Sequence, residues 1–240
     1  MYVDFGFNSL HSSAFVDLSR RKQRKVKERV EESIDRVAAR LEGHIELPLR
    51  TKVKFIDSDE VDACVAGMTL KINTSTLRYA LKRSRVFDGL IGHETSHLSD
   101  FRTGNFTRQG LPEPVVRLVH EGKAEHVGLM IGGQDFTDRY GLARADGAVM
   151  QDLYPRIERV RRPLGRIANC LMPDNPNNIT ADYGVAHSRR AAYTIGYTLV
   201  GDAMSWKHAD SILDVHALAN TAIVDMAVEQ WRSTSHNSAS

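Results

Sequence analysis

The 240-residue chain has little of what builds disulfide-linked or membrane-spanning proteins. It contains only two cysteines, which excludes a disulfide scaffold as a main source of stability and makes a reducing compartment the simpler interpretation. No apolar run approaches the roughly 18 residues that a membrane-spanning helix needs. The N-terminus lacks the basic start and apolar run of a signal peptide. The sequence therefore predicts a cytoplasmic protein without a membrane partner.

Charge of one sign is also scarce, because the net charge is only +2 with 26% charged and 42% hydrophobic residues. These values are typical of a globular domain and do not favour nucleic acid as a partner. The exception is the segment 20–29, which holds seven cationic residues. We interpret it as a solvated helix face, because acidic residues dilute its charge, namely Glu28, Glu31, Glu32 and Asp35. The alternative is a binding or regulatory domain that uses this basic segment.

Hydrophobic periodicity predicts an α+β fold. An apolar stripe with spacings of three and four indicates a helix over 17–41, formed by Val26, Val30, Ile34, Val37 and Leu41. Alternating residues over 51–58 and 67–75 indicate strands of a small, mostly antiparallel sheet. The remainder is mainly helical, with patterns at 77–83, 85–102, 114–131, 145–171 (broken near Pro155 and Pro163), 187–205 and 210–232. We expect one catalytic domain over 1–232, with a helix and sheet in 1–76 and a helical part in 77–232, and a disordered tail over 233–240.

The stretch GHETSH, which ends at His97, contains the pattern HExxH. On a helix, His93 and His97 lie one turn apart on one face, so their imidazoles can converge on one ion. Glu94 is rotated by about 100°, which directs its carboxylate to a water on the metal rather than to the metal. This geometry is that of a zinc site in which the glutamate is the general base. Chance occurrence of the pattern on an ordinary helix is the alternative.

A catalytic zinc needs a third protein ligand and an open position for water. The later stretch HEGKAEH, residues 120–126, lies in a predicted helix and offers Glu121 and Glu125, four residues apart on one face. One of the two can bind the metal while the other orients a ligating histidine. His120 and His126 are further candidates for the third ligand.

HETSH followed by HEGKAEH resembles the gluzincins, metallopeptidases whose third zinc ligand is a glutamate on a following helix. The resemblance implies that Glu121 is the ligand and that Glu125 hydrogen-bonds a ligating histidine. It also implies a zincin-like fold, in which the small sheet packs on the active-site helix. The metzincin extension is absent, because Asp100 and Gly104 stand where its glycine and third histidine would be.

With the later stretch AAYTIGYTLVG, the motifs also resemble the family of predicted zinc proteases known as DUF2268, over roughly residues 60–205. Ala192 departs from that family, which tends to carry glycine before the first tyrosine. Tyr193 and Tyr197 lie four apart and can face one cleft, and this resemblance favours them as the groups that stabilise the oxyanion. His187, five residues after Asp182, is the alternative by similarity to thermolysin-like gluzincins.

The sequence thus predicts a zinc metallopeptidase with one zinc per chain. His93, His97 and Glu121 are the expected ligands, Glu94 is the expected base, and Tyr193 or His187 is expected to stabilise the oxyanion. The partner is a peptide or protein substrate, which we expect to pair with strand 67–75 as the edge of the sheet. A zinc hydrolase of a non-peptide substrate is the alternative. Oligomeric state and cleavage preference are not encoded in these motifs.

Overall fold

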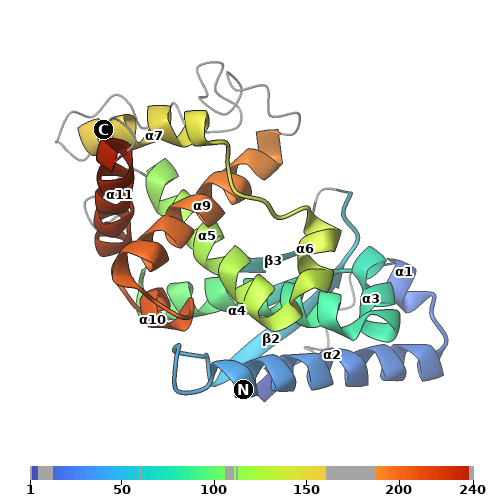
Figure 1. Ribbon diagram of the computed structural model, residues 1–240. Coiled ribbons are helices and arrows are strands. Elements are labelled where there is room, and N and C mark those ends of the chain that lie inside the picture. Colours follow the sequence, from blue (N-terminus) through green and yellow to red (C-terminus); the bar gives the residue numbers. More distant parts are fainter. Residues whose placement is uncertain are drawn as a thin grey trace. The chain divides into compact units, whose positions relative to one another are not determined.

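The computed structural model describes residues 2–4, 13–59, 61–105, 111, 113–160 and 188–237 (Figure 1). The chain divides into two compact units. Unit 1 comprises residues 1–104 and 127–141, and unit 2 comprises residues 105–126 and 142–240. The boundary at residues 126 and 127 falls inside one continuous helix, α5 (Glu113–Gly132). This helix therefore belongs to both units.

Unit 1 contains a four-stranded sheet in the order β1-β2-β4-β3, with β1 (Tyr2–Asp4), β2 (Arg50–Ile56), β3 (Ala63–Ala66) and β4 (Thr69–Asn73). Alternation buries Val53 and Phe55 on β2 and Leu70 and Ile72 on β4. Phe15, from α1 (Ser13–Val16), stacks on Phe55 with ring centroids 4.4 Å apart. The apolar face of the sheet is thus part of the core of unit 1.

The sheet differs from the predicted, mostly antiparallel one. β1 pairs with β2 and β2 pairs with β4 in parallel, and only β3 and β4 are antiparallel. The reason is that helix α2 (Arg20–Leu41) connects β1 to β2 as a crossover, which a parallel pair requires. The unpredicted strand β3 forms a hairpin with β4 and occupies the end of the sheet. The prediction that 67–75 is the edge strand is therefore wrong.

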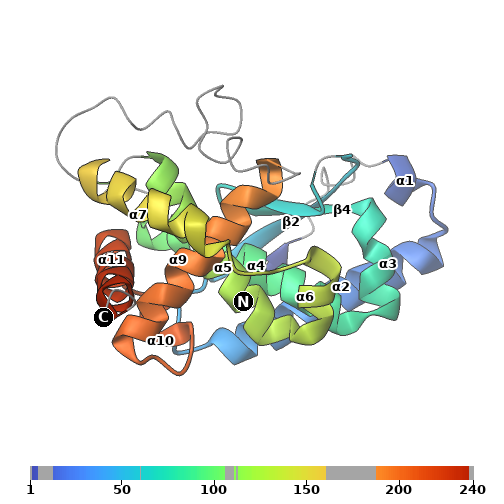
Figure 2. The same cartoon turned by 45° about the horizontal axis from the view of Figure 1, so that its top comes forward.

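Helices α2 and α4 (Ser84–Thr103) run in the same direction within unit 1. Ser33 donates a 2.5 Å hydrogen bond to Asp88, and Glu46, which follows α2, pairs with Arg102 near the end of α4 at 3.4 Å. Helix α3 (Leu77–Lys82) packs against both α2 and α4. Figures 1 and 2 show α3 beside the N-terminal half of α2. Helix α6 (Gln134–Tyr140) also packs on α4.

Unit 2 is helical in its described part. Helix α9 (Ser188–Lys207) packs on α11 (Asn220–Asn237) and on the short α10 (Leu213–His216). Helix α7 (Gly147–Val160) packs on α11, where Tyr154 stacks on Trp231 and donates a 2.5 Å hydrogen bond to Asp202 of α9.

The predicted helix positions agree with the observed ones, apart from several interruptions. α7 continues through Pro155, so the break predicted there is wrong, and Pro163 lies outside the described residues. The pattern 210–232 is divided into α10 and α11, and α11 extends to Asn237, into the segment predicted as a tail. None of the described helices is long and apolar enough to cross a membrane.

Candidate metal centre

Helix α4 carries the HExxH motif and is buried on nearly every side. Every residue from Gly89 to Asp100 is buried, including His93, Glu94 and His97, which are 7%, 4% and 9% exposed. Polar side chains are costly to bury unless they gain a partner. The helix begins at Ser84 and ends at Gly104, which takes the left-handed conformation (φ 73°) common at helix C-termini. Three buried, ionisable side chains are thus held on one rigid helix.

The two histidines face each other. Their Nε2 atoms lie 3.2 Å apart, and their rings meet edge to face with centroids 4.9 Å apart. Two nitrogen ligands bound at about 2.0–2.1 Å to a tetrahedral zinc lie roughly 3.3 Å from each other. The separation of the Nε2 atoms therefore fits two ligands of one zinc ion.

Glycines set the approach of α5 to α4 within unit 1. A Cβ atom on Gly89 would lie 3.0 Å from the carbonyl oxygen of Gly128, and one on Gly132 would lie 3.0 Å from the carbonyl oxygen of Arg85. Position 85 is thus opposite 132 and 89 is opposite 128, which makes the helices antiparallel.

Glu121 completes a group of three potential ligands. One ligand atom each from His93, His97 and Glu121 can be chosen so that all lie within 4.8 Å of one another, and among the described residues this is the one such group. Glu121 is half-buried, and Glu125, one turn later, is buried. The donor set of two imidazoles and one carboxylate is a known set for catalytic zinc.

The other two candidates for the third ligand have different contacts. His120 is buried, with Nε2 3.1 Å from the carbonyl oxygen of Asn105 and 3.3 Å from the side-chain amide of Asn220. His126 donates from Nε2 to the carbonyl oxygen of Tyr197 at 2.9 Å and stacks on its ring at a centroid distance of 4.1 Å. Burial lowers the pKa of His126 to about 4, so this histidine is neutral. Both histidines are therefore part of the packing of unit 2.

Tyr193 and Tyr197, two of the side chains predicted to stabilise the oxyanion, have different surroundings. Tyr197 packs on His126, whereas Tyr193 is half-buried and lies one turn earlier on α9. Between them, Gly196 meets Gly122 of α5, where an added Cβ on Gly122 would lie 2.1 Å from the carbonyl oxygen of Gly196. This close crossing brings α9 against the turn of α5 that carries Glu121. His187 lies outside the described residues.

Cys64 on β3 is a neighbour of the site that the sequence did not reveal. Strand β3 packs on α4, and the pKa of the half-buried Cys64 thiol is raised by burial and, to a smaller extent, by the negative charge of Glu94. The end strand of the sheet therefore passes close to the predicted general base. The stretch ACVA is too short to show an alternating pattern, so this strand cannot be recognised from the sequence.

Comparison of the chain with protein-family models, with curated proteins and with solved structures found no significant match. The interpretation of the site therefore depends on its motifs and on its geometry.

Proposed function

We propose that the protein binds one zinc ion per chain through His93, His97 and Glu121 and hydrolyses peptide bonds. The observation that carries this proposal is the 3.2 Å separation of the two Nε2 atoms, together with a carboxylate from a second helix in the same group. Burial of two polar histidines that face each other beside a third donor is costly unless they gain a common partner. When bound, zinc would polarise the substrate carbonyl and activate water at this position.

The remaining steps belong to side chains of the protein. Glu94 follows the first ligand directly and is buried, which suits a base that accepts the proton of the attacking water. Tyr193 is the candidate donor of a hydrogen bond to the oxyanion, because Tyr197 already packs on His126. Glu125 would hold a ligating imidazole in orientation.

A peptide is the substrate class that the fold supports best. β3 is an end strand of the described sheet, and it lies near Glu94. An end strand has backbone N–H and C=O groups on its outer side, with which an extended peptide can pair. A substrate bound in this way would run across α4. A non-peptide substrate would not need the strand.

The metal content of purified full-length protein tests the zinc site. We expect one zinc per chain in the wild type and its loss in His93→Ala, with His44→Ala, at an exposed position, as the matched control. Zinc that remains stoichiometric in His93→Ala would refute the site.

Cleavage of unfolded casein or of a peptide library tests the reaction. Glu94→Gln should keep zinc and fold but lose hydrolysis by on the order of 10² to 10⁴-fold, because the base is removed and the ligands stay. Loss of zinc in this variant would make Glu94 a ligand instead, and equal activity would exclude it as the base.

A further inference from the structure

Positive charge is concentrated in two short segments of unit 1. Residues 20–29 hold seven cationic residues and one acidic residue, and residues 78–85 hold four cationic residues and no acidic one. Their combined net charge is +10, so the rest of the chain carries −8 to give the total of +2. The low net charge of the chain is therefore the sum of a strongly positive part, the two segments, and a negative remainder.

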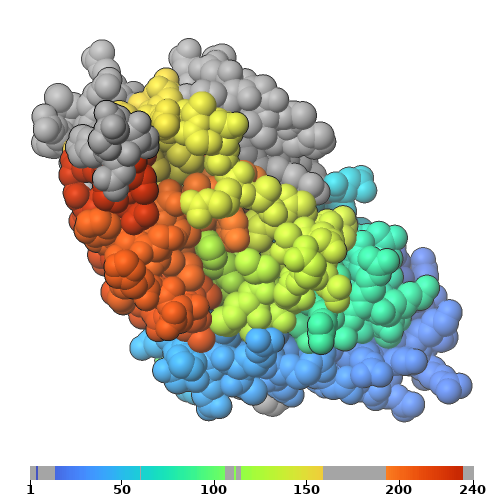
Figure 3. All heavy atoms as spheres, in the orientation of Figure 1, coloured from blue at the N-terminus to red at the C-terminus, as the bar shows by residue number. Residues whose placement is uncertain are grey.

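The fold brings these two segments together. Ser33 and Arg36 of α2 hydrogen-bond Asp88, which lies one turn after the start of α4. Because α2 and α4 run in the same direction, the start of α4 lies one turn earlier along α2, beside residues 29–32. Helix α3, which ends at Lys82, packs on both. Figure 3 shows that residues of α2, α3 and the start of α4 adjoin on one face of this unit. We call the cationic residues of 20–29 and 78–85, with Arg139 of α6, the basic surface.

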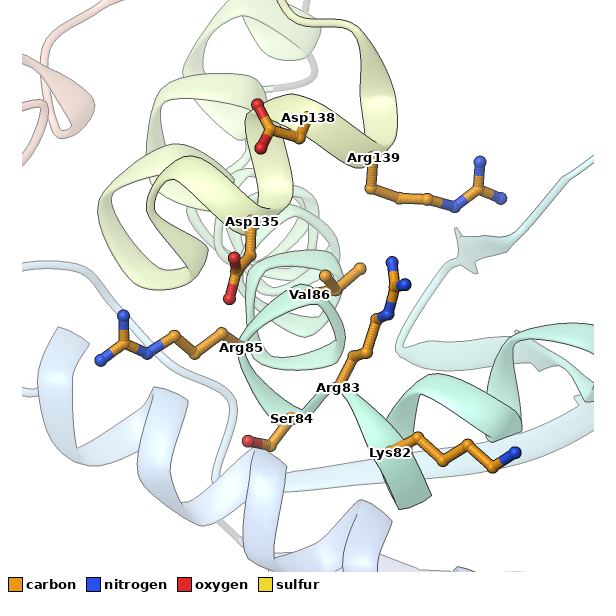
Figure 4. A pocket seen from close by; sticks show the side chains of 8 residues that line it. All are labelled: Lys82, Arg83, Ser84, Arg85, Val86, Asp135, Asp138 and Arg139. Carbon is orange, nitrogen blue, oxygen red and sulfur yellow. The ribbon is translucent and has the colours of Figure 1, made fainter.

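A pocket lies within this surface. It is lined by Lys82, Arg83, Ser84, Arg85, Val86, Asp135, Asp138 and Arg139. In Figure 4, Arg83, which lies between α3 and α4, and Arg139 from α6 extend to one side of the pocket, and Arg85 and Asp135 lie on the other. The four cations of the pocket come from α3 (Lys82), α4 (Arg85), α6 (Arg139) and the residue between α3 and α4 (Arg83), and they outnumber the two carboxylates that share the pocket.

Most of these cations have no acidic partner in the described part of the chain. On α2, Arg24 pairs with Glu28 and Arg29 pairs with Glu32. Arg139 contacts Asp62 at 3.3 Å. Within the residues that the structure describes, no ion pair involves the exposed side chains of Arg20, Arg21, Lys22, Lys25, Lys82, Arg83 and Arg85. The acidic residues of α2 therefore leave much of the charge uncompensated, in contrast to the interpretation of a diluted, solvated face.

We infer that the basic surface binds the phosphate backbone of double-stranded nucleic acid, without reading its sequence. Eight of its twelve cations are arginines, whose planar guanidinium groups bind phosphate in a bidentate manner. A duplex carries one negative charge per about 1.7 Å of axis, and ten residues of helix extend about 15 Å, enough to reach several phosphates.

The surroundings of the basic surface argue against three other polyanions, namely single-stranded nucleic acid, an anionic membrane and an acidic peptide. Among the described residues, the large exposed apolar side chains within the segments 20–29 and 78–85, or up to four residues from them in sequence, are Val16 and Leu81, and neither is aromatic. A single strand is bound largely by stacking of bases on aromatic rings, and a membrane helix inserts a continuous apolar face. An unfolded acidic peptide has a lower charge density than a duplex and loses more conformational entropy on binding.

Fluorescence anisotropy with a labelled duplex of random sequence, titrated with full-length protein between about 50 and 200 mM salt, tests the inference. We expect binding whose logarithmic salt dependence corresponds to at least about four phosphates, since each neutralised phosphate contributes a slope of about −0.9. The single strand, polyglutamate and vesicles containing phosphatidylserine should bind more weakly at equal salt. No binding of the duplex at the lowest salt, or tighter binding of any of these three, would overturn the inference.

A matched pair of variants separates the surface from net charge. Arg21→Glu, Lys25→Glu and Arg83→Glu combined should weaken duplex binding by more than about tenfold and reduce the salt dependence by several phosphates. Lys52→Glu, Arg117→Glu and Lys207→Glu combined change the net charge equally at exposed positions elsewhere and should leave affinity nearly unchanged. Circular dichroism confirms the fold of both variants. Equal weakening by the two sets would show that binding does not use the basic surface.

Discussion

Glu121 and Glu125 differ by one turn on the same helix, and the partner of each decides its role. The two carboxylates lie on one face of α5, because four residues advance a helix by about one turn. Glu121 is in the group of potential ligands, whereas the more buried Glu125 is not. A direct ligand contributes a bond to the ion, and a residue that orients a ligand contributes only through it.

We therefore expect Glu121→Ala to lower zinc affinity much more than Glu125→Ala, which should cost about 10 to 100-fold. Competition with a zinc chelator at fixed pH measures both. Glu121→Gln and Glu125→Gln, which keep the size of the side chain, serve as controls for packing. If Glu125→Ala loses zinc first, Glu125 is the ligand, one turn of α5 away from the expected one.

Individual residues of the site could be predicted where helix geometry alone relates them. His93, Glu94 and His97 occupy five consecutive positions, so their relative orientation follows from the helix. Tyr193 and Tyr197 also share a face, but the sequence cannot show that His126, 71 positions earlier, stacks on the second of them. The sequence therefore cannot decide between side chains that only tertiary packing brings together.

At the scale of elements, helices with a long apolar period were predictable and short elements were not. β3 has four residues, α6 has seven, and neither holds enough repeats to define a period. The parallel pairing of β1 with β2 depends on the crossover through α2 rather than on either strand. The alternating pattern of β2 and β4 is the same in parallel and antiparallel neighbours when one face is buried, and this is why the sheet type was predicted wrongly.

The close crossing of α5 and α9 leads to a prediction for Gly122. Its substitution by alanine would place a methyl group 2.1 Å from the carbonyl oxygen of Gly196, so the helices must separate. Gly122→Ala should destabilise the protein by about 1–3 kcal/mol, as overpacking does, and lower zinc affinity, because Glu121 is adjacent. Thermal unfolding and chelator competition measure the two effects.

Gly147→Ala is the matched control, because a Cβ there meets nothing within 4 Å. It should change stability by less than about 1 kcal/mol, since Gly147 is at the start of α7. Unchanged stability and zinc affinity in Gly122→Ala would mean that the two helices are less closely packed than described.

For the whole molecule, His126 predicts a loss of stability in acid. Burial lowers its pKa to about 4 in the folded state, against about 6.5 for an unperturbed histidine. The unfolded state therefore binds the proton more tightly, so the contribution of His126 is complete above pH 6.5 and decreases as the pH falls toward 4. This residue alone should remove about 2 kcal/mol from the free energy of unfolding between pH 7 and pH 5.

Urea unfolding of zinc-free protein at several pH values measures this contribution. His126→Gln keeps a hydrogen-bond donor for the carbonyl of Tyr197 but does not titrate, so its stability should depend less steeply on pH than that of the wild type. His44→Gln, at an exposed position, should follow the wild type. Parallel pH dependence in His126→Gln and the wild type would contradict the assignment.

The path of the chain through the two units has a consequence for inheritance. The chain passes from one unit to the other after residues 104, 126 and 141, and the middle passage is within helix α5. Neither unit is encoded by one uninterrupted stretch, so recombination at a single point cannot duplicate, exchange or remove either of them intact. We therefore expect these two units to be inherited together, and a fragment that ends at residue 104 to lack the segment of α5 that covers Gly89 and Gly92.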